Sequence, residues 1–500
     1  MKKIHKKWHE EADVVVVGYG GAGAIAAITA HDEGAKVLIL EKASEGEEGG
    51  NTRVSGNIWF TPEPPDKAAT YLRAMCGDYE LSEKMIRVWA DAMSLNNELV
   101  KSLGGEPSER KALIVEFPDL PGVECVHVYV NGPETSQFGG DEALWLLLKD
   151  CVEKRGIRIL FETPGKRLVQ NPRTHEILGL IAHRAGKDIA IKGKKAVVLT
   201  CGGFENNPEM MRNYLTNLPR CYPKGTPYNT GDGIKMALDV GADLWHMPNI
   251  AGPQYSFKLP DRDVVMYPRK MPGNSYVYVA VTGERFVCEQ AYLIQTPEGP
   301  RYPVKHGKIW KYGQWIPSPT PPSIYCIFDE KTRRNGPIYG GEPYKLGWVE
   351  ILKLYDWSED NSQEIEKGWI KRASTISELA KNLGFPPTKL EDTISRYNHY
   401  CEQGKDPDFD RDPKSLDPIN EPPYYGMPLV PNFINTQGGP RRNEKAQIMN
   451  PFDEPIRRLY SAGELGSIYS FLYQGGGNVG ECLAFGRIAG RNAAAEKPWE

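Results

Sequence analysis

The sequence predicts an α/β fold in which a domain built on a parallel sheet is interrupted by a smaller α+β capping domain. Three observations support this prediction. Segment 13–17 is a short apolar run, and a glycine-rich turn, an alanine-rich helical segment and a second apolar run at 36–40 follow it. This is the order of a β-α-β unit with parallel, buried strands. Glycine-rich segments return from 437 onward, whereas the sequence from about 254 is dense in aromatic residues and proline.

The predicted domain segments are therefore 1–253 and 424–500, which together form a nucleotide-binding domain, and 254–423, which forms the cap. At roughly 150 residues per domain, a chain of 500 residues accommodates this division. Periodicity, glycine and proline place the remaining elements. The expected helices are 24–33, 81–103, 141–154, one opened by 230–233, and 478–495, and the expected strands are 123–130, 157–161, 177–184, 187–192 and 196–200.

Composition and charge exclude several classes of protein. No stretch approaches the roughly 18 uninterrupted apolar residues of a membrane-spanning helix, and segment 1–13 lacks the apolar centre of a signal peptide. We therefore expect a cytoplasmic protein without a membrane span. With 61 basic against 65 acidic residues the net charge is −4, which gives no support for a nucleic-acid partner. The nine cysteines are widely spaced, which argues against a disulfide framework or a metal site.

The first β-α-β unit carries a dinucleotide-binding pattern. Gly18, Gly20 and Gly23 follow the first strand and open the helix, and Glu41 ends the second strand. In this pattern the first glycine permits the tight turn, the second lets the backbone approach a pyrophosphate, and the third lets helix and strand pack closely. The helix N-terminus favours the phosphates, and Glu41 is expected to accept hydrogen bonds from a ribose.

The sequence after Glu41 predicts FAD rather than NAD. An NAD enzyme continues through a second β-α-β half, whereas here small polar residues follow at 49–57. Near the C-terminus a strand and turn at 459–464 precede the glycine run 475–477 and the last helix, whose N-terminus would stabilise negative charge on a reduced flavin. The prediction is a Rossmann-like FAD-binding domain interrupted by a substrate-binding cap. The expected cofactor-binding residues are Gly18, Gly20, Gly21, Ala22, Gly23, Glu41, Lys42, Gly50, Asn51, Thr52, Ser55, Gly56, Gly202, Gly203, Asp232, Gly463, Glu464, Asn478 and Val479.

Over nearly the whole chain these segments resemble the fumarate reductase and 3-ketosteroid dehydrogenase superfamily of flavoproteins. The segments that carry the resemblance are 18–23, 49–56, 200–204, 230–233, 283–289, 436–439, 462–464 and 475–490. Fumarate reductase-like members place a His before the Thr-x-Gly-Gly motif and an Arg before the terminal glycine run, but this chain has Asn435 and Gln474. A dicarboxylate requires such cations, so fumarate and succinate are disfavoured.

Ketosteroid dehydrogenase-like members carry two tyrosines, and Tyr473 and Tyr292 stand near the matching places. The resemblance to this branch implies hydride transfer between flavin N5 and a carbon–carbon bond adjacent to a ketone. Tyr473 and the backbone N–H of Gly477 would bind the carbonyl, and Tyr292 would carry the proton. It also implies noncovalent FAD, no metal, a small hydrophobic enone or ketone as substrate, and an unidentified electron donor or acceptor. An enoate reductase acting on an unsaturated carboxylate and a non-catalytic electron-carrying flavoprotein remain alternatives, and direction and oligomeric state are left open.

Overall fold

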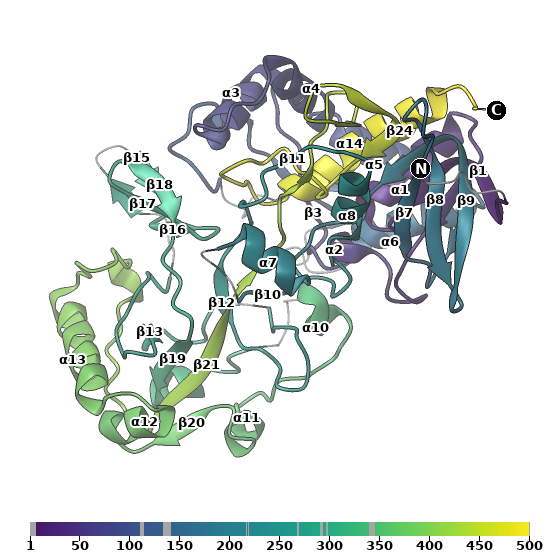
Figure 1. Cartoon of the computed structure of the whole chain (residues 1–500). Coiled ribbons are helices and arrows are strands. Elements are labelled where there is room, and N and C mark those ends of the chain that lie inside the picture. Colours follow the sequence, from purple (N-terminus) through teal and green to yellow (C-terminus); the bar gives the residue numbers. More distant parts are fainter. Residues whose placement is uncertain are drawn as a thin grey trace.

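The computed structural model describes residues 7–110, 115–133, 142–216, 218, 220–267, 270–290, 294–296, 299–339 and 346–499. Figure 1 shows two lobes, one that contains both ends of the chain and one formed by the middle of the sequence. The mixed fold of strands and helices confirms the predicted α/β class. None of the helices in the described part of the chain has the length and hydropathy that a membrane-spanning helix needs.

The first lobe is organised around a sheet with the strand order β23-β24-β9-β1-β2-β6, to which β7 and β8 are added beside β9. β1 pairs in parallel with β2 and β9, and β24 pairs in parallel with the other side of β9. The C-terminal segment therefore completes the sheet that the N-terminal segment begins. The strands are β1 (Glu10–Val17), β2 (Val37–Leu40), β6 (Arg158–Leu160), β7 (Gly165–Gln170), β8 (Ile177–Arg184), β9 (Lys187–Leu199), β23 (Gln447–Met449) and β24 (Pro455–Ser461).

Two long helices of this lobe, α1 (Gly21–Asp32) and α14 (Gly477–Ala495), pack closely on each other. A Cβ on Gly486 would lie 2.9 Å from the carbonyl oxygen of Ala22, and one on Gly490 would overlap the carbonyl of Ala26. Glycine on one helix and alanine on the other let the two backbones approach more closely than larger side chains allow.

The other elements of the first lobe surround this core and the approach to the cap. They are α2 (Gly50–Arg53), β3 (Ile58–Phe60), α3 (Pro65–Cys76), α4 (Glu83–Met93), α5 (Asn96–Ser102), β4 (Pro107–Glu109), η1 (Val123–Cys125), β5 (Val128–Asn131), α6 (Ala143–Lys154), α7 (Pro208–Tyr214), α8 (Asp232–Asp239), β11 (Leu244–Trp245) and β22 (Gly439–Pro440).

Four expected elements differ in the structure. The helix expected at 81–103 is interrupted between α4 and α5, where buried Asn96 donates from Nδ2 to the carbonyls of Phe60 and Gly480. The strand expected at 123–130 begins instead as the short 3-10 helix η1. The strands expected at 187–192 and 196–200 are one strand, β9, because a bulge beside Ala12 of β1 absorbs the irregularity between them.

The cap contains a second sheet with the order β10-β21-β19-β13, and β12 and β20 pair with β21. Its central strand β21 begins at the residue after the predicted domain boundary and pairs with β19 of the cap. The cap therefore extends to Phe433, whereas the predicted boundary lay after Pro423. The elements of this part are β10 (Tyr222–Pro223), β12 (Gln254–Ser256), β13 (Tyr276–Ala280), β14 (Ile294–Thr296), β15 (Gly299–Arg301), β16 (Val304–Lys305), β17 (Lys308–Lys311), β18 (Gln314–Pro317), β19 (Ile324–Asp329), α9 (Glu330–Arg334), α10 (Gly347–Ile351), α11 (Ser362–Glu366), β20 (Lys371–Ala373), α12 (Ile376–Leu383), α13 (Pro387–Gln403), η2 (Pro413–Ser415) and β21 (Tyr424–Phe433).

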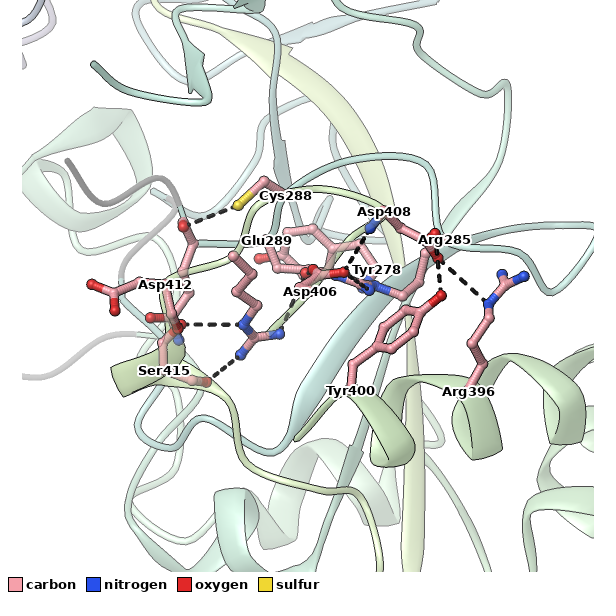
Figure 2. A network of polar contacts seen from close by, with 12 residues as sticks. Tyr278, Arg285, Cys288, Glu289, Arg396, Tyr400, Asp406, Asp408, Asp412 and Ser415 are labelled. Atoms are coloured by element: carbon pink, nitrogen blue, oxygen red, sulfur yellow. Dashed lines mark hydrogen bonds and ion pairs between the residues drawn. The ribbon is translucent and has the colours of Figure 1, made fainter. Parts of the chain in front are cut away.

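A buried ionic network fastens the segment after β13 to the chain after α13 (Figure 2). The Arg285 guanidinium contacts Glu289 at 2.8 Å and Asp406 at 2.8 Å. Arg411 contacts Glu289 at 3.3 Å and donates to the carbonyl of Tyr276 at 2.7 Å. All four charged side chains are buried. The network therefore holds the segment 285–289, which the resemblance singled out, as part of the cap's framework.

Glu289→Gln should destabilise the protein, because it leaves two buried guanidinium groups short of a carboxylate. Removing one partner of a buried ion pair typically costs about 3–5 kcal/mol. Thermal unfolding followed by circular dichroism should show a clear fall in Tm. Asp66→Asn, which breaks an exposed ion pair with Arg87, is the matched control and should leave Tm unchanged. Equal Tm values for wild type and Glu289→Gln would show that the network does not stabilise the fold.

Candidate active site

A cavity lies at the carboxyl edge of the first sheet, where β1, β2 and β9 end. Open parallel sheets bind their ligands at this edge. Many of the predicted cofactor-binding residues line the cavity: Gly18, Gly20, Gly21, Ala22, Glu41, Lys42, Gly50, Asn51, Thr52, Gly202, Asp232 and Glu464. The structure thus brings together residues that lie far apart in the sequence.

The glycines of the first turn serve different purposes. Gly18 has φ +105°, and a Cβ there would lie 2.5 Å from the carbonyl oxygen of Thr200. A Cβ on Gly23 would overlap the carbonyl of Gly18, so both glycines are required by the turn itself. Among the described residues that are not its chain neighbours, the atom nearest to a Cβ on Gly20 would be the carbonyl oxygen of Gly49, at 3.4 Å. Because Gly20 lines the cavity, its lack of a side chain fits the close approach of a ligand.

Acidic and basic side chains of the cavity wall are held in fixed positions. The Glu41 carboxylate, 8% exposed, accepts hydrogen bonds from the N–H groups of Tyr19 and Ala43, both at 2.7 Å. Burial raises its pKa. The Lys42 amine donates to Thr230 at 2.6 Å and to Asp232 at 2.7 Å, which ties the end of β2 to the start of α8. Glu41 lines the cavity, and its role as the acceptor for a ribose stays a prediction.

A buried carboxylate pair lies at the far end of this wall. Asn51 donates from Nδ2 to Glu205 at 3.0 Å and to Glu464 at 3.0 Å, and Asn229 donates to Glu205 at 2.7 Å. Burial and the neighbouring charge of Glu205 raise the pKa of Glu464 well above its usual range. A proton held at Glu464 keeps two adjacent carboxyl groups from being charged at the same time.

Tyr473 lies just before α14, with its side chain buried against the cap. Its hydroxyl accepts a hydrogen bond from the N–H of Asn478 at 3.4 Å. Its ring packs edge-on against Tyr469 and against His306 of the cap, with ring centroids 5.2 Å apart in both pairs. Burial raises the pKa of Tyr473, so the phenol is a neutral hydrogen-bond donor at pH 7.

Several buried polar atoms around Tyr473 have no hydrogen-bond partner among the described residues. They are Tyr469 Oη, Gln474 Nε2, His306 Nδ1 and Asn435 Oδ1. A buried polar atom without a partner costs about 1–3 kcal/mol, and such groups usually have a partner in a working protein. A polar ligand beside the N-terminus of α14 would supply the partners that these four atoms lack.

Other predicted site residues have structural partners of their own. The N–H of Gly477 donates to the carbonyl of Gln474 at 2.9 Å, so in this structure it is not a free donor beside Tyr473. The Ser55 hydroxyl donates to the carbonyl of Thr52 at 2.8 Å. Tyr292 lies outside the described residues. Five more predicted residues lie outside the described cavity lining, and their cofactor roles stay predictions: Gly23, Gly56, Gly203, Gly463 and Val479.

Asn478 also lies outside this lining, and its side chain is engaged in a polar cluster. Its Oδ1 accepts from Gln437 at 3.0 Å and from Asn435 at 3.2 Å, and its Nδ2 donates to the Gln437 Oε1 at 2.9 Å. Its cofactor role remains a prediction as well.

The sequence profile described as "FAD binding domain" matches residues 13–479. The chain belongs to this family. FAD is therefore the cofactor of this protein, as predicted, and the chain is a FAD-dependent oxidoreductase.

Its relatives catalyse reactions of several kinds. The chain is 27% identical to a 3-oxosteroid 1-dehydrogenase of Mycolicibacterium smegmatis, over 97% of this chain and 98% of that protein. It is 28% identical to a fumarate reductase (cytochrome) of Shewanella frigidimarina, over 97% and 77%, and 26% identical to a vinyl phenol reductase of Lactiplantibacillus plantarum, over 97% and 96%. These matches confirm the resemblance to both named branches.

A solved structure shares the fold of the whole chain. It is the 3-ketosteroid delta1-dehydrogenase of Sterolibacterium denitrificans in complex with 1,4-androstadiene-3,17-dione, with a TM-score of 0.77 and 22% identity. The match covers 97% of this chain and 100% of that one.

The cavity fits FAD by its own chemistry. The first turn of α1 contains no acidic side chain, so its N-terminus offers positive potential to a pyrophosphate. Gly20 leaves room for close approach, and the Glu41 carboxylate in the lining is the acceptor predicted for a ribose. Other lining residues were not predicted from the sequence, among them Thr163, Pro164, Tyr228 and Asn229. They follow no motif, because each stands in a loop that only the folded chain brings to the cavity.

Gly20→Val should abolish FAD binding, because the branched side chain would project toward the place of the pyrophosphate. Gly20→Ala should weaken binding to an intermediate extent while preserving the fold, since its Cβ has room in the chain itself. Flavin absorbance of the purified proteins measures the bound fraction, and denaturation of wild type should release FAD. Full flavin content in Gly20→Val, or flavin that stays with denatured wild type, would contradict the predicted noncovalent site.

Proposed function

We propose that this flavoprotein oxidises or reduces a carbon–carbon bond next to a ketone, with Tyr473 donating a hydrogen bond to the ketone oxygen. FAD, when bound, supplies the acceptor or donor of hydride. The observation that carries the proposal is the buried, neutral Tyr473 hydroxyl at the start of α14, near polar atoms that have no partner within the described part of the chain. The described residues of the chain would bind the substrate, polarise its carbonyl group and exclude water from the site.

The position of Tyr473 suits polarisation of a carbonyl. Negative charge develops on the oxygen when the adjacent carbon loses or gains a proton, and a preorganised donor stabilises that charge. The N–H of Asn478, at the positive end of α14, points to the Tyr473 hydroxyl and strengthens it as a donor. Proton transfer from Tyr473 itself is disfavoured because burial raises its pKa.

Neutral side chains beside Tyr473 favour a neutral substrate. Asn435 and Gln474 stand where fumarate reductase-like members carry cations, and both are buried. Gln474 is fixed through its Oε1, which accepts from Tyr71 at 3.0 Å and from the N–H of Glu116 at 3.2 Å, so its amide group is left to face a ligand. A small hydrophobic enone or ketone matches this mixture of aromatic rings and neutral donors.

An unsaturated carboxylate is the second candidate substrate, because the cap brings cations toward the site. Lys224 and Lys308 are buried, and burial lowers their pKa values to about 7 and about 8. The charge of Lys224 also lowers the pKa of His306. A bound carboxylate would be favoured by these cations. A substrate panel distinguishes the two candidates.

Tyr473→Phe should reduce turnover by about 10²–10³, the usual cost of losing one oxyanion-stabilising donor. The assay uses enones and saturated ketones, including 1,4-androstadiene-3,17-dione, with reduced or oxidised dyes. Flavin content and Tm should not change. Tyr460→Phe, which removes a hydroxyl bonded to Glu496 on another part of the lobe, is the matched control. Turnover by Tyr473→Phe within threefold of wild type would make Tyr473 a packing residue.

Fumarate should be a much poorer substrate than the best enone of that panel, because Asn435 and Gln474 carry no charge to pair with its two carboxylates. The comparison is of kcat/KM with the same reduced dye. Fumarate reduction as efficient as that of the best enone would favour the carboxylate candidate and its lysines.

A further inference from the structure

A two-residue turn of the cap carries His306 to Tyr473. Lys305 of β16 pairs with Lys308 of β17, so His306 and Gly307 alone form the turn, with φ +43° and +69°. Two positive φ values at these places are those of a type I′ hairpin turn. A Cβ on Gly307 would overlap the carbonyl of Gly252. The turn therefore rests directly on the backbone of the segment before β12, which fixes its position.

The turn itself does not need a histidine. Asn-Gly is the pair that type I′ turns favour. The same small sheet has a second such turn, in which Tyr312 and Gly313 have φ +57° and +78° and Tyr312 is 81% exposed. The His306 side chain is only 8% exposed and contacts Tyr473. A buried residue that is not the best choice for its own turn points to a role beyond folding.

Glu116, from the first lobe, holds the imidazole. Its carboxylate lies 2.9 Å from His306 Nε2 and 3.1 Å from the Lys305 amine, and it also accepts from the N–H of Gly475 in the glycine run before α14. Burial alone would raise the pKa of Glu116, but His306 and Lys305 outweigh it and lower the pKa to about 2. The carboxylate is ionised, so Nε2 of His306 must be the donor.

This hydrogen bond fixes which nitrogen is available for chemistry. With the proton on Nε2, a neutral imidazole presents the lone pair of Nδ1, and Nδ1 is buried without a partner among the described residues. We propose that His306 is the catalytic residue that takes up or returns the substrate proton at Nδ1, and that Glu116 is its positioning residue. This inference rests on the proposed function, since it assigns the proton of that same reaction.

The assigned step is a proton transfer. In the oxidising direction, the carbon next to the carbonyl gives its proton to Nδ1, and the electron pair of that C–H bond stays in the substrate as an enolate whose oxygen is held by Tyr473. The imidazole becomes an imidazolium that Glu116 stabilises through Nε2–H. In the reducing direction the imidazolium returns the proton from Nδ1 to the same carbon. The substrate's hydride is exchanged with the FAD of the proposed function.

The charged groups that shift the pKa of His306 come from three parts of the chain. Glu116 belongs to the first lobe, Lys305 to the same hairpin, and Lys224 follows β10. Burial lowers the pKa of His306; Glu116 opposes this effect and the two lysines add to it. In the protein without substrate, the His306 imidazole is therefore neutral at pH 7. The rate of substrate oxidation should fall as the pH drops through this lowered pKa, because protonated His306 can no longer act as the base.

The test is His306→Asn in the holoenzyme, with the best ketone of the panel as probe. Asparagine preserves the turn, so the variant should fold and bind FAD as wild type does. We expect kcat to fall by about 10²–10⁴, the range for loss of a general acid–base residue, with KM little changed and the acidic limb of the pH profile lost. Tyr312→Asn, the same change at the other turn, should behave as wild type. His306→Asn turnover within threefold of wild type would overturn the assignment.

A second measurement needs no substrate. Nitrogen NMR of holoenzyme containing ¹⁵N-histidine, with His306→Asn used for assignment, reports the tautomer. We expect Nε2–H with unprotonated Nδ1 at pH 7, and a change of tautomer balance in Glu116→Gln. An Nδ1–H tautomer in wild type would overturn the assignment independently of activity. If wild type with bound FAD turns over no member of the panel, the proposed function itself has failed and this inference with it, an outcome distinct from an unaffected His306→Asn variant.

Discussion

The close packing of α1 on α14 is the constraint on which the site depends. Each helix begins at a functional turn: α1 at the glycines that face the cofactor cavity, and α14 at the glycine run beside Tyr473. Because Gly486 and Gly490 bring α14 against the backbone of α1, these two N-termini are held at a fixed offset. The distance between the phosphate end and the substrate end of the site is therefore set by two helix backbones rather than by flexible side chains.

The site is completed by side chains from both lobes. The first lobe supplies Tyr473 and Glu116, and the cap supplies His306 and Lys305. The cofactor cavity is lined by the first lobe, whereas the groups that we assign to the substrate come from both lobes. The four buried polar atoms around Tyr473 that have no partner among the described residues lie near this same boundary, and a ligand bound there would offset the cost of leaving them unpaired.

The sequence predicted the cofactor half of the molecule well because that half is encoded locally. The turn 18–23 and Glu41 follow strands with clear apolar patterns, and the structure places them together at the sheet edge. The helix break at Asn96 was missed because it depends on carbonyls of Phe60 and Gly480, which the pattern of that segment does not contain. Family resemblance, rather than periodicity, singled out Tyr473.

The substrate half was harder to predict, since its groups meet only through tertiary contacts. Glu205 was missed although it follows a recognised glycine pair, because its partners Asn51 and Glu464 lie far away in the sequence. His306 had one local signal, a positive-φ position before a glycine in a short hairpin, but no spacing relates it to Glu116 or Tyr473. The boundary at 423 was placed by composition, and β21 continues the cap sheet beyond it because its pairing partners are β19 and β20.

The entry and exit of the cap are neighbouring strands. β12 leaves the first lobe and β21 returns to it, and the two pair directly, Gln254 opposite Asn432. Opposed residues of such a pair lie about 5 Å apart, so the two ends of the inserted segment nearly touch. A segment whose ends coincide can be lengthened, shortened or exchanged without disturbing the sheet that receives it. The substrate-binding cap can therefore change while the flavin site stays the same. A chimaera joined at these two strands would exchange the cap and leave the flavin-binding lobe intact.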